Sequence, residues 1–232
     1  MCGRYAITTP PQELSKLFQA IGAIPNFPPR FNAAPSQILP VVRRSPKGAR
    51  DLALMRWGLI PGWSKGPDAR FSMINARSDT VAQKPAYRGA YRHRRCLVPA
   101  DGFFEWKAER GGKQPYYFSL KSGDTFAFAG LWEHWIGPGG DEIESFAVVV
   151  TDANDCVTHV HDRMPVILSP ADYGRWLGEE DIPARELAAL MRPFPGEDMQ
   201  AWPVSRKVNS PAYDGPDLVV AVEPPAADAI LL

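Results

Sequence analysis

The sequence has few cysteines, no long apolar run and no excess of charge of either sign. Its three cysteines, Cys2, Cys96 and Cys156, indicate no disulfide framework in a chain of 232 residues, which favours a reducing compartment. No apolar run is long enough to span a bilayer, and the first residues lead into no apolar signal segment. These absences argue against secreted and membrane proteins, and we expect a soluble, cytoplasmic protein.

The charges balance, with 26 basic and 26 acidic side chains and a formal net charge of zero. Composition alone therefore gives no argument for a nucleic-acid partner. The charges are nevertheless unevenly spread, since basic residues gather at positions 43–50 and 88–95 and acidic residues at positions 179–186. A neutral protein can still carry a basic face, although the same charges can simply solvate loops.

Proline and glycine, with 24 and 19 residues, are scattered and divide the chain into short elements. No linker or internal repeat separates two halves, and hydrophobic residues make up 45% of the chain, which is in the globular range. We therefore expect one domain over residues 1–222, followed by a loose Pro/Ala-rich tail at residues 223–232.

Residues near the start of the chain carry the signals of a helix. Thr9 can cap it, Pro10 fits its first turn, Gln12 can complete a capping box, and Gly22 is expected to end it. Further helices are expected at residues 170–177 and 183–191.

Runs rich in β-branched and aromatic residues, separated by turn residues, predict short strands. They lie at residues 38–42, 52–57, 96–98, 103–106, 116–120, 126–132, 146–150 and 166–168. Strands and helices do not alternate strictly, which disfavours a doubly wound sheet. We predict an α+β fold: a single β-rich domain on a curved, mostly antiparallel sheet or an open barrel, with flanking helices.

Cys2 is a candidate nucleophile because enzymes that remove the initiator methionine prefer a small second residue. Removal of Met1 would leave an α-amine and a thiol on adjacent carbons, with reference pKa values of about 7.7–8.0 and about 8.5. About a tenth of such an amine is free base near neutral pH, against below about one in a thousand for lysine. The pair can trap an aldehyde as an imine and then as a five-membered thiazolidine. The plain alternative is an incidental or buried cysteine.

Glu105 and His161 are candidate proton-transfer groups. Glu105 lies among aromatic residues, which tend to raise a carboxyl pKa, and histidine suits proton transfer near neutral pH. The alternatives are a solvated glutamate and a structural histidine. A zinc site built on Cys156, His159, His161 and Asp162 matches no standard spacing, and we expect neither a metal nor a cofactor.

Other residues are candidates for holding a nucleic acid. Asn75 and Arg77 are two apart, so on a strand they would face the same way and suit a sugar hydroxyl and a phosphate. Arg4 follows Cys2 by the same spacing. Three tryptophans can stack unpaired bases, although each can equally be a core residue; they are Trp57, Trp63 and Trp106.

Together these segments resemble the SOS response-associated peptidase (SRAP) family, the abasic-site crosslinking proteins. The matching segments, in the family's order, are residues 1–5, 30–35, 57–61, 75–78, 95–99, 102–106, 161–165, 203–205 and 208–209. Each motif is weak by itself, but the ordered set, which spans residue 2 to about residue 209, is highly specific.

The resemblance implies a covalent trap for abasic sites in single-stranded DNA, with possible slow self-reversal. Cys2 would join the ring-opened abasic sugar, and Asn75 would hold the Cys2 backbone or the sugar. Glu105 would orient the amine and move protons. His161 would protonate the sugar ring oxygen and help to open the ring.

The resemblance also implies a path for the DNA. Arg4 and Arg77 would grip the flanking phosphates, and the path would be lined by Asn32, Pro35, Trp63, Trp106 and Thr151. Ser64 stands where some relatives place a second aromatic residue, so base stacking on that side would be weaker. The implied partner is single-stranded DNA or its junction with duplex. We take a monomer as the default, since the sequence does not show the oligomeric state, and expect the protein to be nucleoid-associated when it is bound to DNA.

Three hypotheses follow for the function. An aldehyde trap needs both the amine and the thiol of Cys2. A thiol (auto)peptidase would use Cys2 with His161 and either Glu105 or Asn75. A non-catalytic nucleic-acid-binding module would need none of this chemistry. Whether Met1 is removed by an aminopeptidase or by the protein itself stays open.

Overall fold

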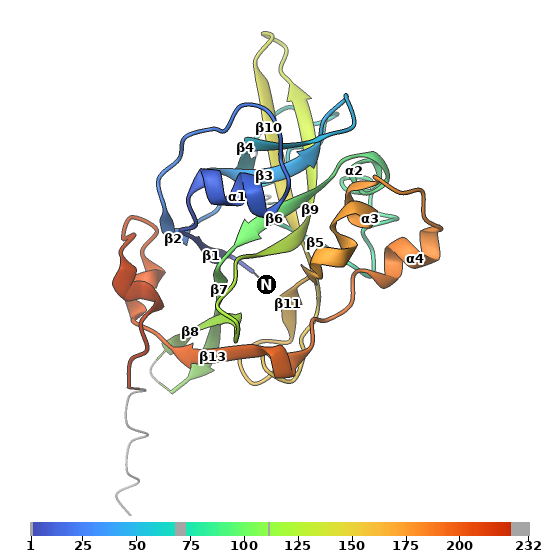
Figure 1. Ribbon diagram of the computed structural model, residues 1–232. Coiled ribbons are helices and arrows are strands. Elements are labelled where there is room, and N and C mark those ends of the chain that lie inside the picture. The colour runs from blue at the N-terminus through green and yellow to red at the C-terminus, as the bar shows by residue number, and fades with distance from the viewer. Residues whose placement is uncertain (1, 68–72, 111, 224–232) are drawn as a thin grey trace, which may run out of the picture.

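Two β-sheets make up most of the computed structural model, which describes residues 2–67, 73–110 and 112–223 (Figure 1). In the larger sheet, the pairings β10–β4–β3–β6–β9 continue with β9 pairing back onto β10, so that these strands close a ring. The ring strands are β3 (Ile38–Arg44), β4 (Arg50–Trp57), β6 (Arg95–Ala100), β9 (Phe126–Ile136) and β10 (Glu142–Asp152). Three short strands extend this sheet: β5 (Asn75–Arg77) and β11 (Arg163–Pro165) on β10, and β12 (Ile167–Leu168) on β9.

The smaller sheet is antiparallel throughout and carries the start of the chain. Its spatial order is β13 (Met199–Pro203), β8 (Gly112–Leu120), β7 (Gly102–Glu109), β1 (Arg4–Ile7) and β2 (Arg30–Ala33). Gly102 begins β7, where a Cβ atom would lie 2.3 Å from the Tyr117 ring. Glycine therefore lets β7 lie close against β8.

The helices are short and flank the sheets (Figure 1). They are α1 (Pro11–Leu17), α2 (Arg88–His93), α3 (Tyr173–Leu177) and α4 (Ala184–Ala189), with 3-10 turns η1 (Pro170–Asp172), η2 (Gly196–Asp198), η3 (Arg206–Asn209) and η4 (Pro216–Val219). No helix in the described ranges is long and apolar enough to span a membrane.

The predicted start and end of the first helix were wrong. Pro10, not Thr9, is the N-cap of α1, and no side chain caps the helix, so the capping box with Gln12 does not form. The Thr9 hydroxyl instead donates to the Asp101 carboxylate at 2.9 Å. The helix ends at Leu17, before a left-handed Gln19 (φ 54°), so Gly22 does not terminate it.

The predicted fold class is confirmed: the chain forms a β-rich α+β domain with mostly antiparallel sheets and few short helices. Every predicted strand run overlaps a strand, and the two later helices form as η1–α3 and α4. Several short elements had not been predicted, namely β1, β2, β5, α2, β11 and β13.

The main core fills the ring and the space between the sheets. Residues at the centres of β9 and β10 are buried in unbroken runs, because both faces of these strands are covered. A second apolar cluster lies on the other face of β7 and β8, where residues near the C-terminal end of the described chain pack. It contains Ala6, Phe104, Tyr117, Val204, Val208 and Leu218. The smaller sheet is therefore covered on both faces, and this fixes the strand that follows Cys2.

Candidate active site around Cys2

Four residues predicted to be catalytic come from separate parts of the chain and lie close together. Cys2 lies two residues before the start of β1, Asn75 begins β5, Glu105 lies in β7, and His161 lies between β10 and β11. The Asn75 amide donates a 2.8 Å hydrogen bond to the Cys2 carbonyl. The Glu105 carboxylate lies near enough to Cys2 and to His161 for the charges to affect one another.

Cys2 is fully buried, at 0% exposure, and its thiol points toward the Arg4 carbonyl at 4.0 Å. Burial raises the pKa of the thiol well above its ordinary value, and the nearby Glu105 carboxylate raises it further. The sulfur is therefore a thiol rather than a thiolate at neutral pH. A thiol peptidase needs the thiolate, so the raised pKa does not favour that activity.

Asn75 is held from both sides and keeps one free acceptor. Its backbone pairs with β10 opposite Val148, and its carbonyl accepts the Tyr87 hydroxyl at 2.9 Å. The side-chain oxygen is buried and has no hydrogen-bond partner among the described residues. A buried acceptor beside Cys2 can receive an N–H from an amine or an O–H from a sugar.

Glu105 is almost completely buried, at 2% exposure. Burial raises its carboxyl pKa, while the charge of His161 acts in the opposite direction. A carboxyl group with a raised pKa retains its proton nearer to neutral pH, and it can therefore give and take protons beside Cys2.

His161 is partly buried, and two groups meet its Nδ1 atom. The backbone N–H of Arg163 donates to Nδ1 at 2.9 Å, and an oxygen of the Asp162 carboxylate lies 2.9 Å from the same atom. Both contacts hold the ring by its Nδ1 side.

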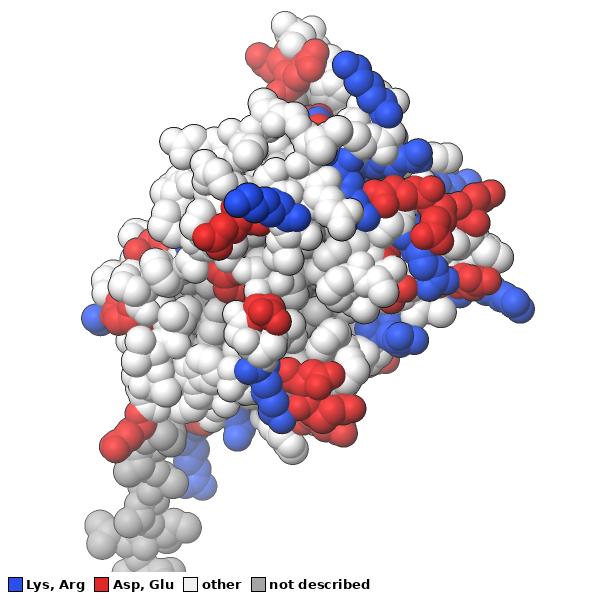
Figure 2. Space-filling model, in the orientation of Figure 1, with Lys and Arg blue, Asp and Glu red and all other residues white. Residues whose placement is uncertain are grey.

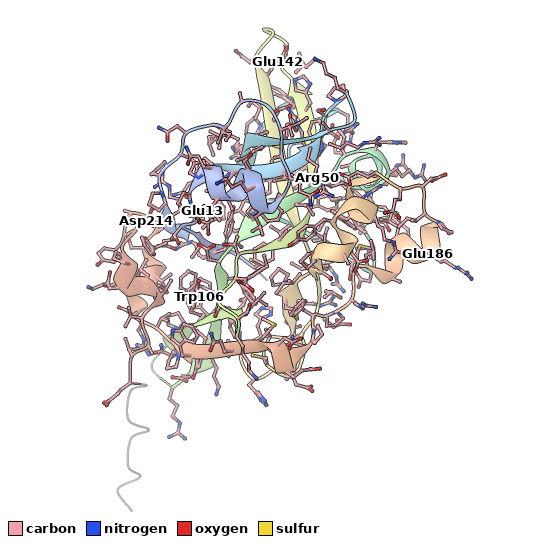
Figure 3. The ribbon with its side chains drawn as sticks, viewed as in Figure 1. Glu13, Arg50, Trp106, Glu142, Glu186 and Asp214 are labelled. Atoms are coloured by element: carbon pink, nitrogen blue, oxygen red, sulfur yellow. The ribbon has the colours of Figure 1, made fainter. Side chains whose placement is uncertain are left out.

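Residues of the C-terminal part of the described chain support Arg4 and Trp106. The Arg4 guanidinium donates to Asn32 Oδ1 at 3.0 Å and to the Val208 carbonyl at 2.6 Å. Trp106, labelled in Figure 3, donates its indole N–H to Asn209 Oδ1 at 2.7 Å. Asn32 is fully buried, so its side chain supports Arg4 and is not itself exposed to a ligand.

Asn75 and Arg77 differ in their surroundings although both lie on β5. The Asn75 side chain contacts Cys2, whereas Arg77 is exposed and paired with Asp79. Thr151 is buried in β10, one residue beyond the partner of Arg77, Val150. β5 therefore runs from the buried Cys2 site to an exposed arginine.

Trp63 lies in the loop after β4 and is 70% exposed. The Trp135 indole holds this loop by donating a hydrogen bond to the Ser64 carbonyl at 2.9 Å. Pro35 lies in the turn after β2, beside a left-handed Ser36 (φ 72°). Both positions are open to a ligand.

For Trp57 the sequence left two alternatives, base stacking and a core position, and the structure shows the core position. The side chain is fully buried, its ring packs edge-on against Tyr5 at 5.1 Å, and its indole donates to the Ile74 carbonyl at 3.1 Å. Trp57 is therefore a core residue.

Three arginines in the basic groups at residues 43–50 and 88–95 are paired with carboxylates. The pairs are Arg43 with Asp51 and Glu144, Arg50 with Glu179, and Arg94 with Glu133. On the face shown in Figure 2, basic and acidic side chains are correspondingly mixed. The charge of these three arginines is therefore balanced by neighbouring carboxylates.

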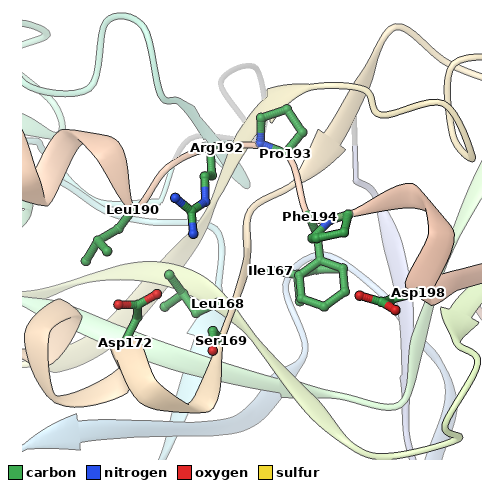
Figure 4. Close-up of a pocket in the computed structure, with 10 residues that line it drawn as sticks. Ile167, Leu168, Ser169, Asp172, Leu190, Arg192, Pro193, Phe194 and Asp198 are labelled. Carbon is green, nitrogen blue, oxygen red and sulfur yellow. The ribbon is translucent and has the colours of Figure 1, made fainter.

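Two further features lie outside the Cys2 site. A pocket of about 300 Å³ lies between β12 and the segment after α4 (Figure 4), and its lining, as far as the described residues show, includes none of the predicted site residues. Within the described ranges, no three His, Cys, Asp or Glu side chains gather as a metal site requires, the segment with Cys156 and His161 included.

No sequence pattern pointed to Asp79, Arg163 or Asn209, which contact the predicted site residues. Asp79 follows Arg77 by two positions, and Asn209 lies in the last matching segment of the family resemblance. These positions were the sequence signals for Asp79 and Asn209, and neither signal indicated what the residue does in the site.

A family model described as SOS response associated peptidase (SRAP) matches residues 1–211. The chain is 36% identical to the abasic site processing protein YoqW of Bacillus subtilis over 222 residues, covering 94% of this chain and 99% of that protein. It is 31% identical to the abasic site processing protein HMCES of Xenopus tropicalis over 265 residues, covering 96% of this chain and 78% of that protein.

Solved structures share the fold. A Bacteroides thetaiotaomicron protein superimposes with a TM-score of 0.86 at 26% identity, covering 96% of this chain and all (100%) of that one. A phage-related protein of Bordetella bronchiseptica superimposes with a TM-score of 0.70 at 31% identity, covering 88% and 95% of the two chains.

Proposed function

This chain belongs to the SOS response-associated peptidase family, and from that premise we propose that it processes abasic sites by capturing them covalently through Cys2. The substrate is the ring-opened abasic sugar in single-stranded DNA or at its junction with duplex. One observation carries the proposal: Cys2 is buried with its carbonyl held by Asn75, beside a carboxyl group of raised pKa.

The reaction begins once Met1 has been removed and Cys2 carries a free α-amine. The amine attacks the aldehyde carbon of the sugar, and the carbinolamine loses water to give an imine. The thiol then adds across the C=N bond, with sulfur bonding to carbon and the proton passing to nitrogen. The product is a five-membered thiazolidine that contains both reactants less one water.

The neighbouring residues supply positioning and proton transfer. Asn75 holds the Cys2 carbonyl at 2.8 Å, and its unpartnered oxygen can accept a hydrogen bond from the amine or the sugar. Glu105 protonates the leaving hydroxyl of the carbinolamine and later accepts a proton. His161 protonates the sugar ring oxygen, which opens the ring to the aldehyde.

The DNA would run over the exposed groups near Cys2. Arg77 and Arg4 would contact phosphates, while Trp63 and Trp106 would stack on bases. Asn32, Pro35 and Thr151 would support this path. The protein would act as a monomer, with no metal or cofactor.

A thiol peptidase is the second candidate, because the matching family model is described as a peptidase. Cys2, with His161 and Glu105 or Asn75, would then form a triad-like set. The raised pKa of the thiol opposes this activity, because a thiol peptidase needs the thiolate.

The test is the intact mass of the protein before and after incubation with a single-stranded oligonucleotide that carries one abasic site. We expect loss of Met1 and a mass increase equal to the oligonucleotide less one water, absent in Cys2→Ala. A bulky residue inserted between Met1 and Cys2 keeps the thiol but blocks the α-amine, and should abolish the adduct. A processed N-terminus without any adduct would overturn the proposal and favour the peptidase.

A further inference from the structure

The exposed arginine beside the Cys2 site is already occupied by a carboxylate. Arg77 Nε lies 3.2 Å from Asp79 Oδ1, and Arg77 Nη2 lies 2.6 Å from Asp79 Oδ2. Asp79 Oδ2 also lies 3.9 Å from Nη2 of Arg163. Two parallel hydrogen bonds make this a bidentate pair, the same geometry in which arginine binds a phosphate.

The strand pairings gather further charges at the same place. β5 runs parallel to β10 with Arg77 opposite Val150, and β11 runs antiparallel to β10 with Arg163 opposite Asp152. Arg163 Nη1 lies 3.3 Å from Asp152 Oδ1, and Asp162 directly precedes Arg163. The charges of Asp152 and Asp162 also act on Arg77.

Two guanidinium groups therefore face three carboxylates at one end of β5, β10 and β11. Asp79 alone contacts both arginines. A phosphate that reaches this surface meets no surplus of positive charge from these groups, although the DNA path passes here under the proposed function.

We propose that Asp79 restrains DNA binding by occupying the Arg77 donors that a phosphate would otherwise take. Intact single strands then bind weakly and leave, whereas a strand with an abasic site is retained by its covalent bond to Cys2. This inference rests on the proposed function and adds a residue that sets the preference for damaged DNA.

The physical basis is competition between two anions for one guanidinium. A phosphodiester must either displace the Asp79 carboxylate or lie beside it, and like charges at such distances repel. Removal of this one exposed charge should tighten binding about two- to fivefold, the size of an exposed ion pair. It should also make the salt dependence steeper, by about 0.7 in the log–log slope for single strands.

The opposing interpretation is that Asp79 only holds Arg77 in position for DNA. Asp79→Asn distinguishes a restraining role from a positioning role, because asparagine keeps the size of the side chain and an oxygen that can accept a hydrogen bond from Arg77. Loss of a positioning group leaves affinity unchanged or weaker, whereas loss of a competing anion increases it.

The experiment measures affinity for an undamaged single-stranded oligonucleotide by fluorescence anisotropy at several salt concentrations. The control is Asp141→Asn, which makes the same charge change beside the opposite end of β10. We expect Asp79→Asn to bind two- to fivefold more tightly, at about the strength of an exposed ion pair, and Asp141→Asn to bind as the wild type does. In an Arg77→Ala background, Asp79→Asn should give no gain.

Equal or weaker binding by Asp79→Asn would overturn the inference, as would a gain that persists without Arg77. Intact mass after incubation with abasic DNA, in the same preparations, tests the proposed function separately. If the adduct forms and Asp79→Asn binds no more tightly, only the inference about Asp79 fails. If no adduct forms, the proposed function fails whatever the affinities.

Discussion

The amide of Asn75 holds the carbonyl of Cys2 at 2.8 Å, although 73 positions separate the two residues in the chain. The contact joins the start of the smaller sheet to a short strand of the larger one. It fixes the backbone of the proposed nucleophile, whose α-amine and thiol belong to the same residue.

Asn75→Ala should slow adduct formation roughly five- to tenfold, because a buried carbonyl loses its donor and the amine loses a fixed position. Single-turnover kinetics with abasic single-stranded DNA, followed by denaturing electrophoresis, measure the rate. Tyr87→Phe is the control, since it removes the hydroxyl bonded to the Asn75 carbonyl and leaves the Asn75 side chain intact. A normal rate in Asn75→Ala would remove Asn75 from the mechanism.

Glu105→Gln should abolish most of the activity and change how stability depends on pH. Loss of a general acid–base group slows the reaction about a hundredfold or more. Burial raises the Glu105 pKa. Ionisation of this buried carboxyl therefore destabilises the folded wild type only as pH rises above the ordinary glutamate pKa of about 4.3.

Glutamine does not ionise, so the Glu105→Gln variant is not destabilised in this way. The Tm of Glu105→Gln, relative to the wild type, should therefore increase as pH is raised from about 4 to neutrality. Thermal denaturation of both proteins across this range makes the comparison. A difference in Tm that is constant with pH would show that the carboxyl does not titrate with a raised pKa.

The fold could be read from the sequence where burial decides it, as in the apolar runs of β9 and β10. Rules for helix capping that use only neighbouring residues failed where a residue distant in the sequence competes. Thr9 has the right residue type for a cap, but its hydroxyl donates to Asp101 instead. Nothing in the sequence distinguishes Trp57 from Trp63, yet Trp57 is buried and Trp63 is exposed. Which tryptophan is covered depends on strands that are distant in the sequence and pair in the fold.

The site could be predicted only in part from the residues themselves. The chemistry of Cys2 followed from its position after Met1, but its partners lie on β5, on β7 and after β10. No spacing along the chain joins these elements, since strand pairings bring them together. Residue type made these residues candidates, but their roles around Cys2 came from the family resemblance, and Asp79 and Asn209 emerged only from their contacts.

Trp106 should depend on Asn209 for its contribution to DNA binding. The indole donates to Asn209 Oδ1 at 2.7 Å, so Asn209→Ala frees the ring to leave its stacking position. Trp106→Ala should weaken binding to an undamaged single strand by about 1–3 kcal/mol, and Asn209→Ala should give part of this loss. Fluorescence anisotropy provides both affinities.

Trp202→Phe is a matched control, because its indole makes a similar bond to the Val219 carbonyl at 3.0 Å. Unchanged affinity in this variant would show that the effect of Asn209 is specific to Trp106. Equal losses in Asn209→Ala and Trp202→Phe would instead indicate general loosening of the C-terminal part of the described chain.

Cys2→Ser separates the two halves of the proposed chemistry. Serine is small enough for Met1 removal and keeps the α-amine, but its hydroxyl closes the ring far less readily than a thiol. The variant should form an imine that reverses unless it is reduced, so a stable adduct should appear only with borohydride. The wild type should give the adduct without a reductant, and so should Cys156→Ser, which changes a partly buried cysteine outside the site. A stable adduct in Cys2→Ser without borohydride would mean that sulfur is not part of the linkage, and the buried thiol of Cys2 would then need another explanation.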